Sequence, residues 1–155
     1  DKTIKTFRTA LNDVNDALTT LKKKADKYGI DTTRIFLAGN ASGAFLVSSY
    51  IYTYVSGTEP LSKEGIRGVI SISTTTALNL NEFEKNFDNS IKSLIFHGTA
   101  NGQNAEPINS KQLASQLGEL AEFVEVEGAN EFPTPAYTKV VKDKCREFLK
   151  EHTAN

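Results

Sequence analysis

Cysteine is nearly absent from this sequence of 155 residues, in which Cys145 is the only one. A single cysteine excludes an intrachain disulfide and leaves the cellular compartment open. Cys145 lies in a charged, helix-like tail between Lys144 and Arg146, which favours an ordinary helix residue over a nucleophile. The sequence therefore gives no reason to expect cysteine chemistry.

An excess of charge of one sign is also lacking, and so are long apolar runs. The 18 lysines and arginines nearly balance 19 aspartates and glutamates, for a net charge of −1. This balance argues against nucleic acid or an anionic membrane surface as a partner. No apolar run approaches the roughly 20 residues of a membrane span. With 39% hydrophobic and 24% charged residues, the composition is typical of a soluble domain, and the length fits one domain over residues 1–155.

Hydrophobic periodicity predicts a long helix followed by alternating strands and helices. Apolar residues three and four apart run from Ile4 to Tyr28, and Gly29 is expected to end this helix. The same spacing fits a coiled-coil seam, although the strand-like segments that follow favour packing against a sheet. Strands are expected at 34–38, 66–73, 91–97 and 122–126, and helices at 42–55, 110–120 and 136–152.

This alternation of strands and helices predicts an α/β fold. Strands separated by helices pair in parallel through right-handed crossovers, and short continuous apolar runs indicate strands covered on both faces. We expect a three-layer α/β/α sandwich with a mainly parallel sheet of about four strands. In such open sheets ligands bind beyond the carboxyl ends of the strands. A small-molecule ligand is therefore expected at the loops that follow the strands.

Three of these loops carry a family resemblance. They are residues 39–43 (GNASG), 97–102 (HGTANG) and 127–133 (EGANEFP). With their flanking segments they resemble the nucleophile-elbow, acid and histidine loops of the α/β-hydrolase superfamily, and are most similar to its esterase, lipase and kynurenine-formamidase-like branch. The resemblance runs from about residue 13 to the C-terminus and corresponds to the C-terminal half of that fold.

The resemblance implies a serine nucleophile, a histidine base and an acid, but all three positions are substituted here. Ala41 stands at the nucleophile position and has no oxygen with which to attack. Asn101 stands at the acid position and is neutral, so it cannot stabilise an imidazolium. The histidine position falls on Glu131 or Asn130, depending on a small gap. The substitutions predict that the triad chemistry is lost.

The resemblance also implies an oxyanion hole at the first loop. Gly39 and Gly43 remain there, and both are expected to let the backbone make the tight turn. The backbone amide of Ser42 would supply one donor, next to Asn40. The second donor of the family comes from an upstream loop that has no counterpart in this sequence. Residues 39–43 are therefore the candidate pocket.

Other residues offer a second route to hydrolysis. Ser42 carries a hydroxyl beside Ala41, and Glu131 would have to act as its base, which is an unusual arrangement. His97 stands at a His-Gly position that is structural in the family. His152 lies close to the end of the chain. Neither histidine is favoured as a base.

Two further patterns point to ordinary structure. Gly39 and Gly43 before a helix also fit a phosphate-binding turn, but the lysine of a P-loop and the spacing of a dinucleotide fingerprint are missing. Five glutamates alternate between residues 119 and 131, with no histidine or cysteine among them. They indicate a solvated face rather than a metal site. No metal and no cofactor are expected.

The sequence therefore predicts a degenerate α/β-hydrolase relative that acts in binding or assembly. One alternative is an ester or amide hydrolase that uses Ser42, and another is an excised or engineered half-domain. The strand at 34–38 is central in the family but would lie at a sheet edge here, with unpaired backbone groups. The long first helix, a second copy of the chain or a partner chain would cover that edge.

Overall fold

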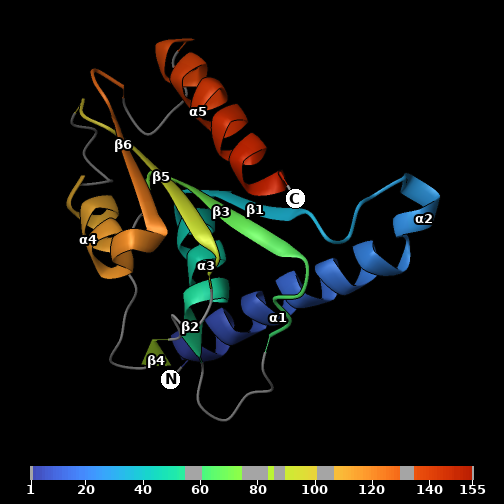
Figure 1. Ribbon diagram of the computed structural model, residues 1–155. Coiled ribbons are helices and arrows are strands. Elements are labelled where there is room, and N and C mark those ends of the chain that lie inside the picture. Colours follow the sequence, from blue (N-terminus) through green and yellow to red (C-terminus); the bar gives the residue numbers. More distant parts are fainter. Residues whose placement is uncertain are drawn as a thin grey trace.

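The structure is a computed structural model that describes residues 2–54, 61–74, 84–85, 90–100, 107–129 and 135–154. Its main sheet has four strands, all parallel, in the order β1-β3-β5-β6 (Figure 1). Their bounds are Ile35–Asn40 for β1, Ile66–Ile72 for β3, Lys92–Gly98 for β5 and Ala121–Val126 for β6. The predicted parallel sheet is confirmed.

Helices cover both faces of this sheet. One face carries α3 (Ser42–Tyr52) and α4 (Pro107–Leu117), and α1 (Lys2–Lys23) packs on α3; the opposite face carries α5 (Pro135–Thr153) (Figure 1). An apolar cluster fills each interface. The first includes Tyr50, Val69 and Leu113, and the second includes Phe96 and Phe148. The predicted three-layer arrangement is confirmed.

The apolar face of α1 is used inside the chain. Leu11 and Leu18 are buried in the first apolar cluster. The ring of Phe7 packs on that of Phe45 in α3, with centroids 5.1 Å apart. The stripe that also fitted a coiled coil is therefore a packing face against α3. Within the described segments, no helix is long and apolar enough to cross a bilayer.

The predicted end of the first helix is confirmed at Gly29, which adopts a left-handed conformation with φ 64°. Such a conformation is a common helix terminator that favours glycine. Ahead of it, the helix is interrupted at Lys24, and a short helix α2 (Ala25–Tyr28) follows. The apolar spacing continues across this interruption, so periodicity alone did not reveal it.

The end of α3 differs from the prediction. The helix stops at Tyr52 rather than near residue 55, and Thr53–Tyr54 forms a short strand β2 that pairs antiparallel with β4 (Glu84–Lys85). Tyr52 is fully buried, and its hydroxyl donates to the carbonyl of Ile91 at 2.7 Å. This hydrogen bond links the last residue of α3 to the residue before β5, at the point where the chain passes from helix α3 to strand β2.

One edge of the main sheet is formed by β1. It pairs with β3 from Ile35 to Asn40 and, within the described segments, with no other strand. Residues 34–38 were predicted to lie at an edge of the sheet, and β1 does lie there. The first helix, α1, packs on α3. Pairing of this edge with a second copy or a partner chain stays a prediction.

Candidate functional site

The turn between β1 and α3 is strained at Ala41. Its backbone has φ 52° and ψ −120°, a conformation that costs a non-glycine residue about 1–3 kcal/mol. Hydrogen bonds hold it on both sides. The amide of Ala41 donates to the carbonyl of Ile72 at 3.0 Å, and its carbonyl accepts from the amides of Ala44 and Phe45 at 3.1 and 3.2 Å. The tight turn is therefore centred on Ala41, whereas Ser42 is already the first residue of the helix.

Close backbone packing explains one of the two glycines at this turn. A Cβ atom on Gly39 would lie 2.2 Å from the carbonyl oxygen of Gly43 and 2.6 Å from the amide nitrogen of Ala44. A Cβ atom on Gly43 would meet no atom within 4 Å in the described structure. The expectation that both glycines are required is therefore met at Gly39 alone.

A second strained residue lies at the end of the neighbouring strand. Ser73 follows β3, is fully buried and has φ 49°; its amide donates to the carbonyl of Phe96 at 2.8 Å. Ala41 and Ser73 are the two non-glycine residues with positive φ among those described. Such strain concentrates at functional sites. Ser73 was missed by sequence reasoning, because nothing in its local sequence signals a left-handed conformation.

The loops after β5 and β6 come together beyond the carboxyl ends of these strands. The amide of Ala100 donates to the carbonyl of Ala129 at 3.0 Å. Asn101 directly follows Ala100, and Asn130 and Glu131 follow Ala129, but all three lie outside the described part of the chain. The roles assigned to these three positions stay predictions.

An apolar groove of about 600 Å³ opens beside the strained turn, between α1 and α3. Its lining consists of Thr6, Phe7, Ala10, Ser42, Gly43, Phe45 and Leu46. Ser42 is exposed in it. The groove can hold an apolar group along the two helices with a polar group at the start of α3. Sequence reasoning missed the contribution of Phe7 and Ala10, because they lie on the same apolar stripe as the core residues of α1.

Each histidine contacts another part of the chain. His97 is buried, and its Nδ1 lies 2.9 Å from the hydroxyl of Ser110 in α4, so the ring ties β5 to that helix. His152 packs edge-on against Phe148, with ring centroids 4.5 Å apart. His152 lines a cavity at the amino ends of the strands, next to Ile66, whereas the turn lies at their carboxyl ends.

The acidic residues of β6 are exposed and have basic partners on both sides of the sheet, rather than forming the single solvated face that was predicted. Glu122 lies 3.2 Å from the amine of Lys144, and Glu125 lies 2.7 Å from that of Lys111. In the part of the chain that is described, no group of three or more histidine, cysteine or acidic side chains is placed to hold a metal ion. Burial raises the pKa of the Cys145 thiol, which disfavours its reactive thiolate.

Several solved esterases share this fold at low sequence identity. A truncated carbohydrate esterase from gut microbiota is 19% identical with a TM-score of 0.64, over 90% of this chain and 68% of that one. The butyrate-bound esterase Est2 of Thermogutta terrifontis is 17% identical with a TM-score of 0.66, over 91% of this chain and 64% of its own. The carboxylesterase of Bacillus cereus is 16% identical with a TM-score of 0.64, over 89% and 59%.

These likenesses show an esterase-type α/β-hydrolase fold, of which this chain spans 59–68% of the neighbours' lengths. No curated protein sequence matches the chain significantly. The model of the BD-FAE family matches residues 2–95, which extend from α1 through the strained turn into β5 and make up well over half of the chain. The resemblance seen in the three loops is thereby confirmed at the level of the superfamily, and the chain belongs to the BD-FAE family.

Proposed function

We propose that this protein binds a small carboxylate with an apolar tail beside the β1–α3 turn and performs no serine-hydrolase catalysis there. The observation that carries the proposal is Ala41 at the centre of the strained turn. In serine hydrolases of this fold a serine hydroxyl occupies that position. A methyl group there leaves the turn without a nucleophile.

The surroundings of Ala41 support the same interpretation. A serine nucleophile needs a base within hydrogen-bond reach. Of the two histidines in the sequence, His97 contacts the hydroxyl of Ser110 through Nδ1, and His152 lies beyond the opposite ends of the strands. Ser42 would therefore lack a histidine even if its hydroxyl faced a substrate.

The lining of the groove favours a ligand that has an apolar tail and a negatively charged end. The rings of Phe7 and Phe45 and the side chain of Leu46 offer an apolar surface for a short chain. At its end the hydroxyl of Ser42 and the first amides of α3 offer hydrogen-bond donors, and the helix dipole favours a negative charge at that point. One solved neighbour is described with butyrate bound, which is a ligand of this chemistry.

We expect that a fluorophosphonate probe will not label the folded protein. The probe reacts with an activated serine, and Ser42 lacks a base that would activate it. Intact-mass spectrometry after incubation, with an active serine esterase as a positive control, checks this result. The second candidate function is hydrolysis by Ser42, favoured by the exposure of that residue in the groove. Stoichiometric labelling that disappears in Ser42→Ala would establish this function and contradict ours.

Hexanoate is expected to bind the groove, and Ala10→Phe is expected to weaken this binding at least about tenfold, because the added ring fills the space for the tail. The matched control is Ala17→Phe, which adds the same ring two turns along α1, outside the groove. Isothermal titration calorimetry on the three proteins measures the effect. Equal affinities in the two variants, or no binding by the unaltered protein, would reject the groove as the site.

A further inference from the structure

A second cavity, of about 230 Å³, lies at the opposite end of the sheet, where the strands begin. Arg34 precedes β1 and Arg67 lies near the start of β3, while the end of α5 closes the cavity with Glu151 and His152. We propose that this cavity binds a compact oxyanion, a phosphate or a carboxylate group, between the guanidinium groups of Arg34 and Arg67.

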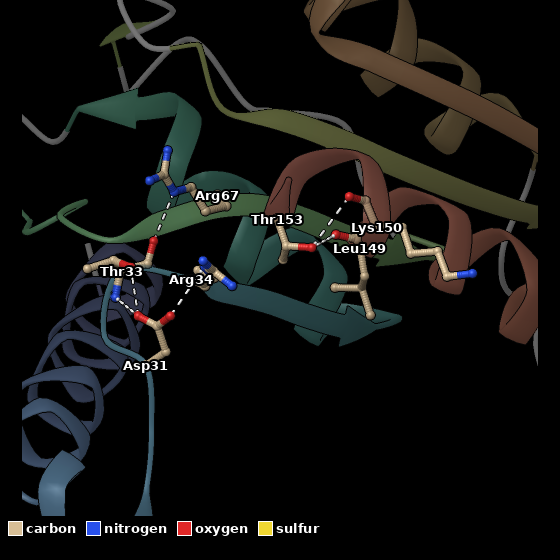
Figure 2. Close-up of polar contacts among 7 residues, drawn as sticks. All are labelled: Asp31, Thr33, Arg34, Arg67, Leu149, Lys150 and Thr153. Carbon is tan, nitrogen blue, oxygen red and sulfur yellow. Dashed lines mark hydrogen bonds and ion pairs between the residues drawn. The ribbon is translucent and has the colours of Figure 1, made fainter. Parts of the chain in front are cut away.

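Each of the two guanidinium groups is held in position through its own Nε atom. Nε of Arg67 donates to the carbonyl of Thr33 at 2.9 Å, and Nε of Arg34 lies 3.3 Å from Oδ2 of Asp31 (Figure 2). Across the described residues, the contacts recorded for these side chains involve no terminal nitrogen. Each arginine thus keeps two Nη groups for a ligand, which is the fork that binds phosphate and carboxylate oxygens in pairs.

The anchor of Arg34 is itself fixed. Both the amide and the hydroxyl of Thr33 donate to Oδ1 of Asp31, at 2.9 and 2.6 Å. These hydrogen bonds, together with the charges of Arg34 and Arg67, hold the pKa of Asp31 below its ordinary value. Asp31 therefore stays ionised to a lower pH than an ordinary aspartate. Since Thr33 contacts both Asp31 and Arg67, one short segment orients the two cations.

The lining sets the size and the charge of the ligand. The cavity is smaller than the roughly 300–1,000 Å³ of sites for drug-sized molecules, and it fits a phosphate or a short dicarboxylate. Its buried apolar wall comes from Ile66 and Ile91. Among the described residues of the lining, Glu151 is the one carboxylate, set against the two arginines. All three side chains are exposed, so solvent and salt screen its repulsion and their attraction alike. His152 also lines the cavity.

Titrations with inorganic phosphate and with succinate, each at a constant ionic strength of about 0.15 M, test this site. We expect saturable shifts in the nuclear magnetic resonance signals of the Nε–H groups of Arg34 and Arg67 and of the amide of Ile66. Saturation by phosphate alone assigns a phosphate ligand, and saturation by succinate alone assigns a carboxylate. Absence of saturation with both anions would overturn the proposal.

Arg34→Gln and Arg67→Gln are each expected to weaken binding at least about tenfold. The matched control is Arg146→Gln, because Arg146 also lies three residues after an aspartate, 3.2 Å from Asp143, but outside the cavity. Arg34→Gln removes only an exposed ion pair, so this variant will remain folded, as its thermal unfolding will show. Unchanged affinity in Arg34→Gln, or equal losses in Arg34→Gln and Arg146→Gln, would contradict the proposal.

Discussion

Gly39→Ala is expected to lower the free energy of unfolding by about 3 kcal/mol or more. The new methyl group would lie 2.2 Å from the carbonyl oxygen of Gly43 and 2.3 Å from its carbonyl carbon. Both are backbone atoms in the first turn of α3, so the helix would have to move away from β1. Urea denaturation monitored by circular dichroism measures the loss.

Gly43→Ala is the matched control for this prediction. A methyl group on Gly43 meets no described atom within 4 Å, and alanine is favoured over glycine inside a helix by about 1 kcal/mol. We therefore expect this variant to be as stable as the unaltered protein or slightly more stable. Similar losses at the two positions would show that close packing of β1 on α3 is not what requires Gly39.

Phe148→Ala is expected to cost about 3–5 kcal/mol, the usual range for removing a buried phenylalanine. Phe148 belongs to α5 and is buried among Leu94 and Phe96. Its ring lies edge-on to that of Phe36, with centroids 6.0 Å apart, directly above Gly68. Because α5 covers this face of the sheet, loss of the Phe148 ring would expose apolar strand residues to water.

The neighbouring Leu149→Ala serves as the control, because Leu149 is 36% exposed. We expect it to cost less than about 1 kcal/mol, since truncation leaves no closed cavity. Thermal unfolding of both variants by calorimetry gives the comparison. A small effect at Phe148 would mean that α5 contributes little to the stability of the sheet, and would contradict the packing described here.

The order of strands and helices could be predicted from the sequence because each element is marked locally. The run from Gly68 to Ser71 in β3 is entirely buried and carries no charged side chain, as expected of a strand covered on both faces. Gly29 ends the first helix by a conformation that favours glycine. The short β2–β4 pair was not predicted, since two residues per strand leave no periodicity to detect.

The candidate site was only partly predictable. The tight turn at Ala41 could be located because residues 39–43 are contiguous in the sequence. The groove brings Phe7 of α1 against Phe45 of α3, a contact that depends on how the two helices pack. The placement of Arg34 and Arg67 at one cavity depends on the register of β1 and β3, which shifts so that Ile35 lies beside Ile66 and Phe36 beside Gly68. No local pattern encodes either arrangement.

The all-parallel order of the main sheet also shapes how the chain can fold. In the part of the chain that the structure describes, no two strands of this sheet form a hairpin; Ile35 pairs with Ile66, and Ser93 pairs with Ala121, each time across an intervening helix. Every strand pairing therefore requires closure of a long loop before any interstrand contact stabilises it, and such topologies fold slowly. Helices such as α1 and α5 can form earlier from local contacts alone. Until the sheet forms, the apolar faces of these helices are exposed to water. We therefore expect the chain to be most prone to aggregation at this stage of folding.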